Sequence, residues 1–141
     1  MVIIKNVREI KEYDVKEAYG QDAEGVTIKW ISEKRTGGEN YLHHFALRYF
    51  VIRPSGYLAL HKHPWEQEIA VTRGRLQVTG SDYNRTIGVG DIAYFPANEE
   101  HGFKAIGNEP SEFYCVIGCM GKGENCIGIS EPQDVHASSP K

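Results

Sequence analysis

The sequence predicts an all-β protein in which eight or nine short strands form one antiparallel barrel or a double-sheet sandwich. Turn-forming Gly, Pro, Asn and Asp residues recur about every eight to twelve residues from position 25 onward, which is the spacing of all-β domains. The segments between these turns are rich in β-branched and aromatic residues, and none shows the periodicity of an amphipathic helix. A barrel or sandwich is favoured because it leaves few strand edges exposed.

Length and composition favour one domain that binds neither nucleic acid nor membrane. The chain has 141 residues, of which 40% are hydrophobic and 25% charged, as in an ordinary folded domain. With a net charge of -3, no overall basic field attracts nucleic acid or an anionic membrane, and no apolar run is long enough to span a bilayer. The chain starts without a secretory signal, and its three late cysteines do not form a disulfide scaffold, so we expect a cytoplasmic protein. We expect its partner to be a small molecule.

The first half of the chain contains an arm and two predicted strands. Residues 1–24 are mixed and charged and are expected to form an N-terminal arm with one short strand. Apolar and polar residues alternate over 26–32, which predicts a strand, whereas the charged, Gly-containing segment 33–40 predicts a loop. Aromatic and β-branched residues over 43–53 predict the next strand, which the Pro-Ser-Gly sequence at 54–56 is expected to end with a turn.

The second half repeats short strands and turns. Segments 75–80 and 84–89 flank a Ser-Asp-Tyr turn and are expected to form a hairpin. Residues 131–141 are polar and unpatterned, which predicts a flexible C-terminal tail and leaves a barrel domain over 25–130. The other strands are expected at 56–63, 67–74, 91–96, 100–107 and 112–119.

Three histidines and one glutamine form a candidate metal site. His61 and His63 lie two residues apart in a predicted strand, so both imidazoles project from the same face. Gln67 opens the strand after the next turn, where its amide can approach the imidazoles, and His101 opens a later strand. Any one of these histidines can equally be a hydrogen-bonded or surface residue. Two imidazoles inside a barrel, however, need partners, which a metal ion provides.

Two ordered motifs carry a family resemblance that extends over roughly residues 40–120. The pattern G-x4-H-x-H-x3-Q-x6-G over 56–74 resembles the first signature motif of the cupin superfamily, and G-x5-P-x4-H over 90–101 resembles the second. The string HKHPWEQE is especially similar to the core of small, single-domain metal-binding cupins. The resemblance implies a jelly-roll β-barrel that holds one divalent metal, and a homodimer formed through N-terminal strands.

The resemblance also implies a ligand set. By position in the motifs, the metal ligands would be His61, His63, Gln67 and His101. Gln67 stands where many relatives have Glu or His, while two further departures, Asn98 and Ala105, fall outside the ligand set. Three imidazoles and a neutral amide leave the full charge on the metal, which favours Fe, Mn, Ni, Cu or Zn over Mg or Ca. An octahedral ion would keep two open positions, which are typical of a catalytic site.

Strand parity predicts the walls of a substrate pocket. Tyr57 and Ala59 share the parity of the His-x-His pair, and Phe103 shares that of the third histidine, so all three are expected to line the cavity. Arg48 can anchor an acidic substrate group, although a salt bridge at the rim is the favoured interpretation.

Two glutamates beside the glutamine ligand are set aside as catalytic bases. Glu68 has the wrong strand parity to point with Gln67, and Glu66 lies in a turn. Both are expected to be solvated or structural.

The predicted function is that of a small metalloenzyme whose substrate chelates the metal through oxygen atoms. Dioxygenase chemistry on an enol, catechol or 1,2-dicarbonyl is the sharpest version of this hypothesis, and a Lewis-acid isomerase with the same ligands and a non-redox metal is another version. A binding or sensing module without turnover is the alternative from another class, because this kind of fold serves many functions. Association is expected as well, since Trp30, Tyr41 and Phe50 are assigned to outer faces that a monomer would expose.

Overall fold

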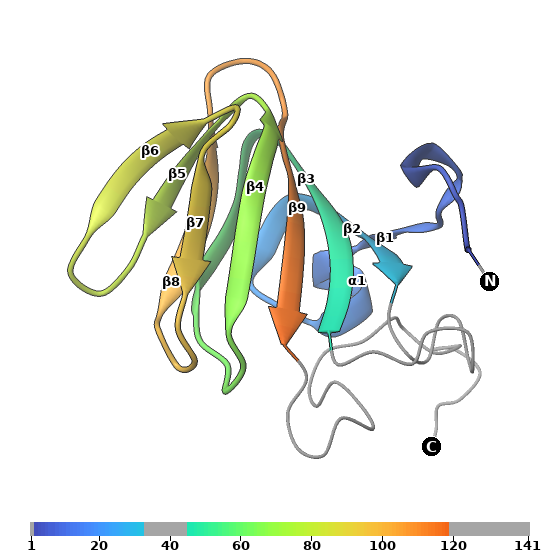
Figure 1. Ribbon diagram of the computed structural model, residues 1–141. Coiled ribbons are helices and arrows are strands. Elements are labelled where there is room, and N and C mark those ends of the chain that lie inside the picture. Colours follow the sequence, from blue (N-terminus) through green and yellow to red (C-terminus); the bar gives the residue numbers. More distant parts are fainter. Residues whose placement is uncertain (1, 33–44, 119–141) are drawn as a thin grey trace.

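Nine strands form one curled antiparallel sheet (Figure 1). The computed structural model describes residues 2–32 and 45–118. The strands are β1 (Glu12–Asp14), β2 (Ala23–Ser32), β3 (Phe45–His61), β4 (Gln67–Arg73), β5 (Arg75–Thr79), β6 (Asn84–Gly88), β7 (Ile92–Phe95), β8 (His101–Ile106) and β9 (Ser111–Gly118). Their order is β6-β5-β8-β3-β9-β4-β7, with β2 beside β3 and β1 beside β2. The all-β class and the jelly-roll barrel that the resemblance implies are confirmed.

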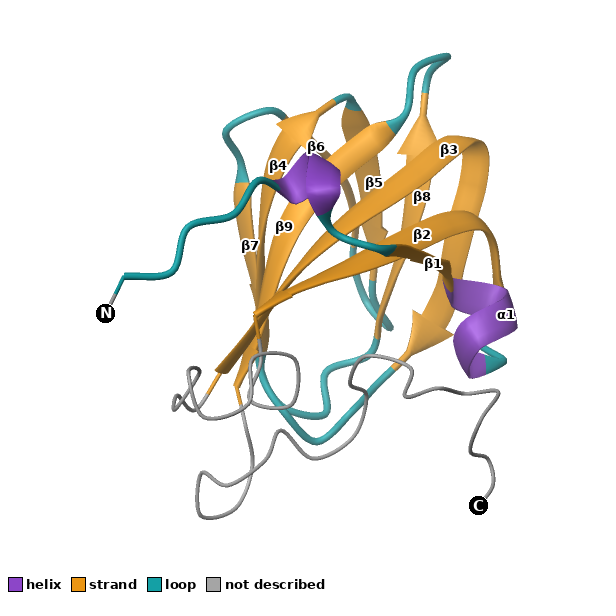
Figure 2. Ribbon diagram, turned by 90° about the vertical axis from the view of Figure 1, so that its right-hand side faces the viewer, coloured by secondary structure: helices purple, strands orange, loops and turns teal. Residues whose placement is uncertain are grey.

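The strands at the two ends of the main strand order, β6 and β7, follow one another in the chain, so the two ends of the curled sheet lie close together. A tight turn joins them, in which the Gly90 N–H donates to the carbonyl of Val71 on β4 at 3.1 Å. The Asp91 carboxylate accepts a hydrogen bond from the Gly88 N–H at 2.8 Å and holds the turn. The side view shows the strands as walls that face one another (Figure 2). Side chains between these walls form the core.

Strand β3 is longer than predicted, because residues 54–56 bend the chain without reversing it. The expected turn would have made two strands, but β3 runs unbroken for 17 residues. Ser55 has a φ of 72°, and Gly56 passes so close to β2 that a Cβ there would lie 2.7 Å from the Glu24 carbonyl oxygen. The part of β3 before the bend pairs with β2 and β9, and the part after the bend pairs with β8 and, at Tyr57 and Leu58, with the start of β2. One strand therefore reaches from the barrel centre to the candidate metal site.

The N-terminal segment contains two short helices that were not predicted. They are a 3-10 turn over Val7–Glu9 and α1 over Val15–Tyr19, which begins after the capping carboxylate of Asp14. Five residues are too few to show a helical repeat in the sequence. No helix in the described part of the chain is long and apolar enough to cross a bilayer. The predicted tail at 131–141 lies outside the described residues.

The core is built from alternating side chains of the facing strands. It includes Val26, Ile28, Trp30, Ala46, Phe50, Ile52, Ile69, Val71, Phe113, Cys115 and Ile117. The assignment of Trp30 and Phe50 to outer faces is therefore wrong: they are 1% and 6% exposed. Both point inward because each has the parity of its buried neighbours, such as Ile28 on β2 and Ile52 on β3. Tyr41 lies outside the described residues.

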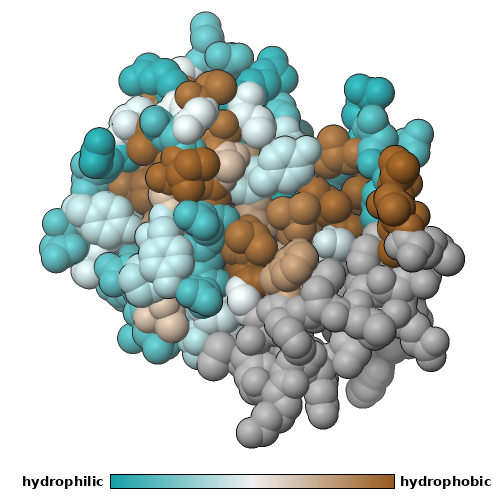
Figure 3. All heavy atoms as spheres, viewed as in Figure 1, coloured by the Kyte–Doolittle hydropathy of each residue, from teal (hydrophilic) through white to brown (hydrophobic). Residues whose placement is uncertain are grey.

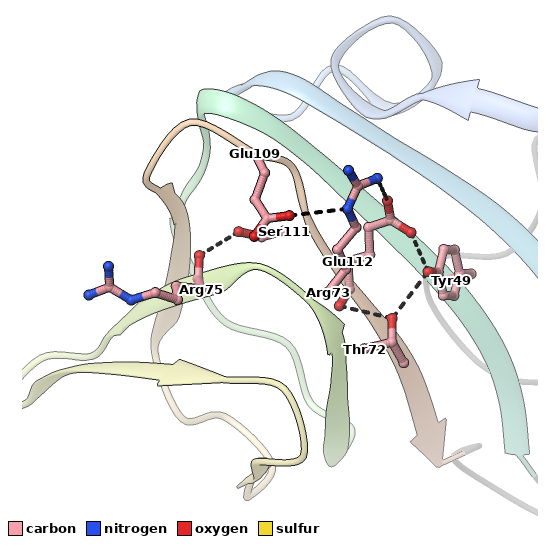
Figure 4. A network of polar contacts seen from close by, with 7 residues as sticks. All are labelled: Tyr49, Thr72, Arg73, Arg75, Glu109, Ser111 and Glu112. Carbon is pink, nitrogen blue, oxygen red and sulfur yellow. Dashed lines mark hydrogen bonds and ion pairs between the residues drawn. The ribbon is translucent and has the colours of Figure 1, made fainter.

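A polar network links β3, β4 and β9 on the outside of the sheet (Figure 4). The Tyr49 hydroxyl donates to the Glu112 carboxylate and lies 3.1 Å from the Thr72 hydroxyl. Arg73 pairs with Glu112 at 3.2 Å and with Glu109 at 3.4 Å. Burial and the hydrogen bond to Glu112 raise the pKa of Tyr49 to about 12, so this hydroxyl remains a donor at neutral pH. Exposed ion pairs contribute little to stability, so the core remains the main support of these strands.

Candidate metal centre

The candidate ligands meet because three strands begin or end at the same place. His61 is the last residue of β3 and pairs directly with His101, the first residue of β8. Gln67 opens β4 beside β9 and β7. His63 lies in the connection between β3 and β4, where its ring stacks on Trp65 with centroids 4.6 Å apart and planes only 3° from parallel. Each candidate side chain is thus fixed by a strand end or by an aromatic neighbour.

The three imidazoles form a compact cluster. The ring centroid of His101 lies 4.4 Å from that of His61 and 4.9 Å from that of His63, and the remaining pair is separated by 5.7 Å. One ring nitrogen from each histidine lies within 4.8 Å of the others. His101 is completely buried, whereas the other two are partly buried. The sequence placed these histidines in one group, and the structure brings them together.

Backbone carbonyls fix the tautomer of all three rings. The Nδ1 atoms of His61, His63 and His101 lie 2.9, 2.9 and 2.8 Å from the carbonyl oxygens of Ala59, Trp65 and Glu99, respectively. A carbonyl oxygen can only accept, so each Nδ1 carries the proton and each Nε2 keeps a lone pair. The Nε2 of His101 is buried and has no hydrogen-bond partner among the residues that the structure describes. Such orientation by a second hydrogen bond is the usual arrangement of metal-binding histidines.

Gln67 adds an oxygen to the same cluster. Its side chain is 4% exposed, and Oε1 lies 2.9 Å from the Nε2 of His63. As assigned, both atoms are acceptors, so either the amide is rotated to present its NH2 group or a cation lies between them. Two neighbouring ligands of an octahedral ion with bonds of about 2.1 Å would be about 3 Å apart. The observed separation therefore fits a shared metal ion.

Burial and a nearby cation keep the histidines neutral. Burial is the main cause that lowers the pKa of all three, and the positive charge of Arg48 lowers each of them further. The pKa of His101 falls to about 4. Imidazoles must be deprotonated to bind a metal. The cluster is thus in its metal-binding protonation state at neutral pH, and its donor set fits a divalent transition metal.

The cavity beside this cluster has a different wall from the predicted one. Its lining residues are Gln21, Arg48, Phe50, Leu58, His61, His63, Gln67 and Phe103. Phe103 lines the cavity as the parity argument predicted, whereas Leu58 stands in place of Tyr57 and Ala59. The correction has a physical cause: the pairing of β3 with β8 shifts register between Leu58 and His61, which reverses the parity on which the prediction relied.

The two displaced pocket residues have other partners. The Tyr57 hydroxyl donates to the Asp22 carboxylate at 3.1 Å on the exposed side of β3. Ala59 contributes its carbonyl oxygen to His61 and so orients a candidate ligand through the backbone. Glu66 and Glu68 are exposed, and Glu66 accepts a hydrogen bond from the Tyr94 hydroxyl at 2.7 Å. Neither glutamate lines the cavity.

Sequence reasoning underrated Arg48 and missed Gln21 and Leu58. Arg48 is 4% exposed and forms part of the cavity wall, so the favoured salt bridge at the rim is wrong. The available signal was its parity with two apolar residues of the same strand, Phe50 and Ile52, which are buried. Gln21 gave no such signal, because it follows the unpredicted helix α1.

Comparisons with known proteins agree with this architecture. The family profile described as a cupin domain matches residues 48–117. The structure resembles the polyketide cyclase RemF from Streptomyces resistomycificus, with a TM-score of 0.73 and 24% identity over 99% of this chain and 95% of that one. A predicted oxalate decarboxylase from Thermotoga maritima gives a TM-score of 0.69 and 18% identity over 84% of this chain and 100% of that one.

A third structure and the matched motifs complete the comparison. A cupin-2 domain from Rhodospirillum rubrum gives a TM-score of 0.68 and 19% identity over 94% of this chain and 80% of that one. No curated protein sequence matches the chain. At these identities the structural likeness concerns the fold, while the family profile spans the two histidine motifs of the site. Through the profile match over residues 48–117, the chain belongs to the cupin superfamily.

Proposed function

We propose that this chain is a metal-dependent enzyme that acts on a small molecule able to chelate the metal through oxygen atoms. The observation that carries the proposal is the convergence of three imidazoles whose Nδ1 atoms are occupied by carbonyls. The buried Nε2 of His101 has no partner in the part of the chain that the structure describes. Buried lone pairs of this kind require a donor or a cation. The proposed ion is divalent Fe, Mn, Ni, Cu or Zn, held by His61, His63, Gln67 and His101.

Dioxygenase-type oxidation of an enol, catechol or 1,2-dicarbonyl is the proposed reaction. A bound transition metal would supply Lewis acidity and, for a redox-active ion, electron transfer. The protein itself contributes neutral donors, which leave the charge of the ion undiminished, and apolar walls at Phe50, Leu58 and Phe103, which exclude water.

A Lewis-acid isomerase with the same ligands is the second candidate. The neutral donor set favours it, because polarisation of a carbonyl needs a strongly charged ion but no redox change. A binding or sensing protein without turnover is the remaining alternative. No Asp or Glu is among the described residues that line the cavity. A carboxylate that acts as a general base therefore does not distinguish the dioxygenase, the isomerase and the binding protein.

Metal content tests the proposal directly. We expect about one divalent ion per chain in protein purified without a metal-affinity tag, and a severe loss in His61→Ala and His101→Ala. Lys62→Ala is the matched control, since this exposed residue lies between two candidate ligands and should leave the metal content unchanged. Equal metal content in all four proteins would contradict the proposal. Oxygen consumption with chelating substrates then separates the dioxygenase from the isomerase and the binding protein.

We also propose a cytoplasmic location and no nucleic-acid partner. The odd number of cysteines supports the first, because disulfide scaffolds use even numbers. Cys115 is buried and free, as expected of a reduced compartment, while Cys119 and Cys126 lie outside the described residues. The net charge of -3 supports the second.

A further inference from the structure

Arg48 is a buried cation with no counter-ion among the described residues. Its Nη2 group donates to the sulfur of Cys115 at 2.8 Å, and its Nε has no hydrogen-bond partner within residues 2–32 and 45–118. The ion pairs of residues 2–32 and 45–118 are Lys16 with Glu24 and Arg73 with two glutamates, so none includes Arg48. A guanidinium offers five donors and remains charged at any physiological pH, which makes its burial without an anion unfavourable.

The surroundings hold this guanidinium in place without neutralising it. Its Cζ lies 5.3 Å from the ring centroid of Trp30 and 5.1 Å from that of Phe50, within range of cation–π attraction. Burial raises the pKa of the Cys115 thiol, so the sulfur is neutral at neutral pH and does not supply an anion. The imidazoles of the same cavity are neutral too. The cavity therefore carries an unbalanced positive charge.

The size of the cavity limits what can balance this charge. Its volume is only about 20 Å³, which excludes bulky anions and leaves room for one or two water-sized atoms, such as the two oxygens of a carboxylate. A planar carboxylate matches the planar guanidinium and is smaller than a tetrahedral phosphate. Gln21, which lines the same cavity, has an amide NH2 that can also donate to an anion. A small carboxylate is thus the ligand group that fits.

We propose that Arg48 binds the carboxylate of the substrate and makes this site specific for small carboxylic acids that also carry a second oxygen for the metal. This inference rests on the proposed metal-dependent function and adds the substrate class to it. Arg48 lines one cavity together with His61, His63 and Gln67, so a single small acid can reach both the guanidinium and an ion held by these ligands. Neutral analogues of the same shape would leave the buried guanidinium unpaired and should bind more weakly.

Matched pairs of acids and amides test the proposal by calorimetry. The probes are glycolate with glycolamide, lactate with lactamide, and acetate with acetamide, each titrated into zinc-loaded protein. We expect the wild type to bind at least one acid about tenfold or more tightly than its amide, because charge-assisted hydrogen bonds are the stronger ones. Arg48→Met should lose this preference, whereas Arg53→Met, on the exposed side of the same strand, should keep it. Arg48→Lys keeps the charge but loses the planar group that can donate two parallel hydrogen bonds to a carboxylate, so it should show a reduced preference for the acids.

Several outcomes would overturn the proposal. It is wrong if the wild type prefers none of the acids, or if Arg48→Met and Arg48→Lys both prefer them as the wild type does. Elemental analysis of the same samples keeps the two proposals apart, since a wild type without metal contradicts the function alone. In that case, the change in unfolding temperature that the acids cause in metal-free wild type and metal-free Arg48→Lys still tests whether Arg48 binds the carboxylate.

A purely structural Arg48 predicts a different stability. Replacing a buried, unpaired charge with an apolar side chain of similar length is often neutral or stabilising. Under our proposal Arg48→Met should therefore unfold at the same temperature as the wild type or higher while losing the acid preference. A lower unfolding temperature with the acid preference retained would show that Arg48 serves the fold and not the ligand.

Discussion

Gln67 is the proposed ligand whose charge can be changed without altering the imidazoles, so we predict that it sets how tightly the site holds its metal. Its oxygen lies 2.9 Å from the Nε2 of His63 and is buried. Gln67→Ala should weaken metal binding about ten- to a hundredfold, the range found when groups that support a site are lost. Gln67→Glu should instead tighten Mn(II) or Fe(II) binding, since a carboxylate adds negative charge beside the ion.

Titration of the metal into metal-free protein measures both effects. Gln77→Ala is the control, because this residue lies on β5 and does not line the cavity. If Gln67→Ala and Gln67→Glu both bind the metal as the wild type does, Gln67 is not a ligand, and its amide only hydrogen-bonds to His63.

The element scale shows where the sequence was a good guide and where it was not. Alternating side chains predicted most strands, because alternation is a local property of each segment. The continuous β3 depends on Gly56 fitting against β2, and the pocket wall depends on the register shift before His61. Both are properties of strand pairs that lie far apart in the sequence. This is why Leu58 could not be placed in the cavity from the parity of its own strand.

Gly74 joins β4 to β5, and its substitution should be costly. It has a φ of 73°, and a Cβ there would lie 2.2 Å from the carbonyl oxygen of Pro110. Gly90 has a φ of 93° with nothing within 4 Å of a Cβ, so it serves as the matched control. We expect Gly90→Ala to cost about 1–2 kcal/mol of the free energy of unfolding, from backbone strain alone. Gly74→Ala should cost about 3 kcal/mol or more, because steric overlap adds to the strain.

Urea denaturation of the two glycine variants measures the difference. The same cost for both would mean that the loop before β9 moves away from Gly74 without penalty. In that case the close contact with Pro110 would not be what requires a glycine in this position.

At the scale of the whole molecule, the sequence predicted the fold class and the grouping of the histidines. Both predictions rest on patterns within single segments and on motif spacing. The charge balance of the cavity was not predictable in this way. It depends on Arg48 being covered by β2 and β9 at once, as its register with Trp30 and Cys115 shows. Because these two strands bury Arg48, it lies in the cavity wall and not at the rim where we expected it.

The outer surface of the sheet supports the predicted homodimer, although through other residues than those first proposed. An outer apolar face over β3, β4, β7 and β9 is visible in the space-filling view (Figure 3). It includes Phe45, Leu47, Ala70, Ile92, Tyr114 and Val116. Phe45 is 43% exposed and Ile92 58%. Contiguous exposed apolar surface of this kind is typical of an interface, and a second copy of the chain is the partner we propose for it.

Sedimentation at micromolar concentration tests this association. We expect a species of twice the 15.9 kDa chain mass. Ile92→Glu should shift it to the monomer, because an ionised carboxylate buried in an apolar interface is strongly unfavourable. Leu60→Glu is the control, since Leu60 is 47% exposed but lies outside the outer apolar face. A wild type that sediments only as the monomer would rule out the dimer. A dimer that both variants preserve would place the interface elsewhere on the barrel.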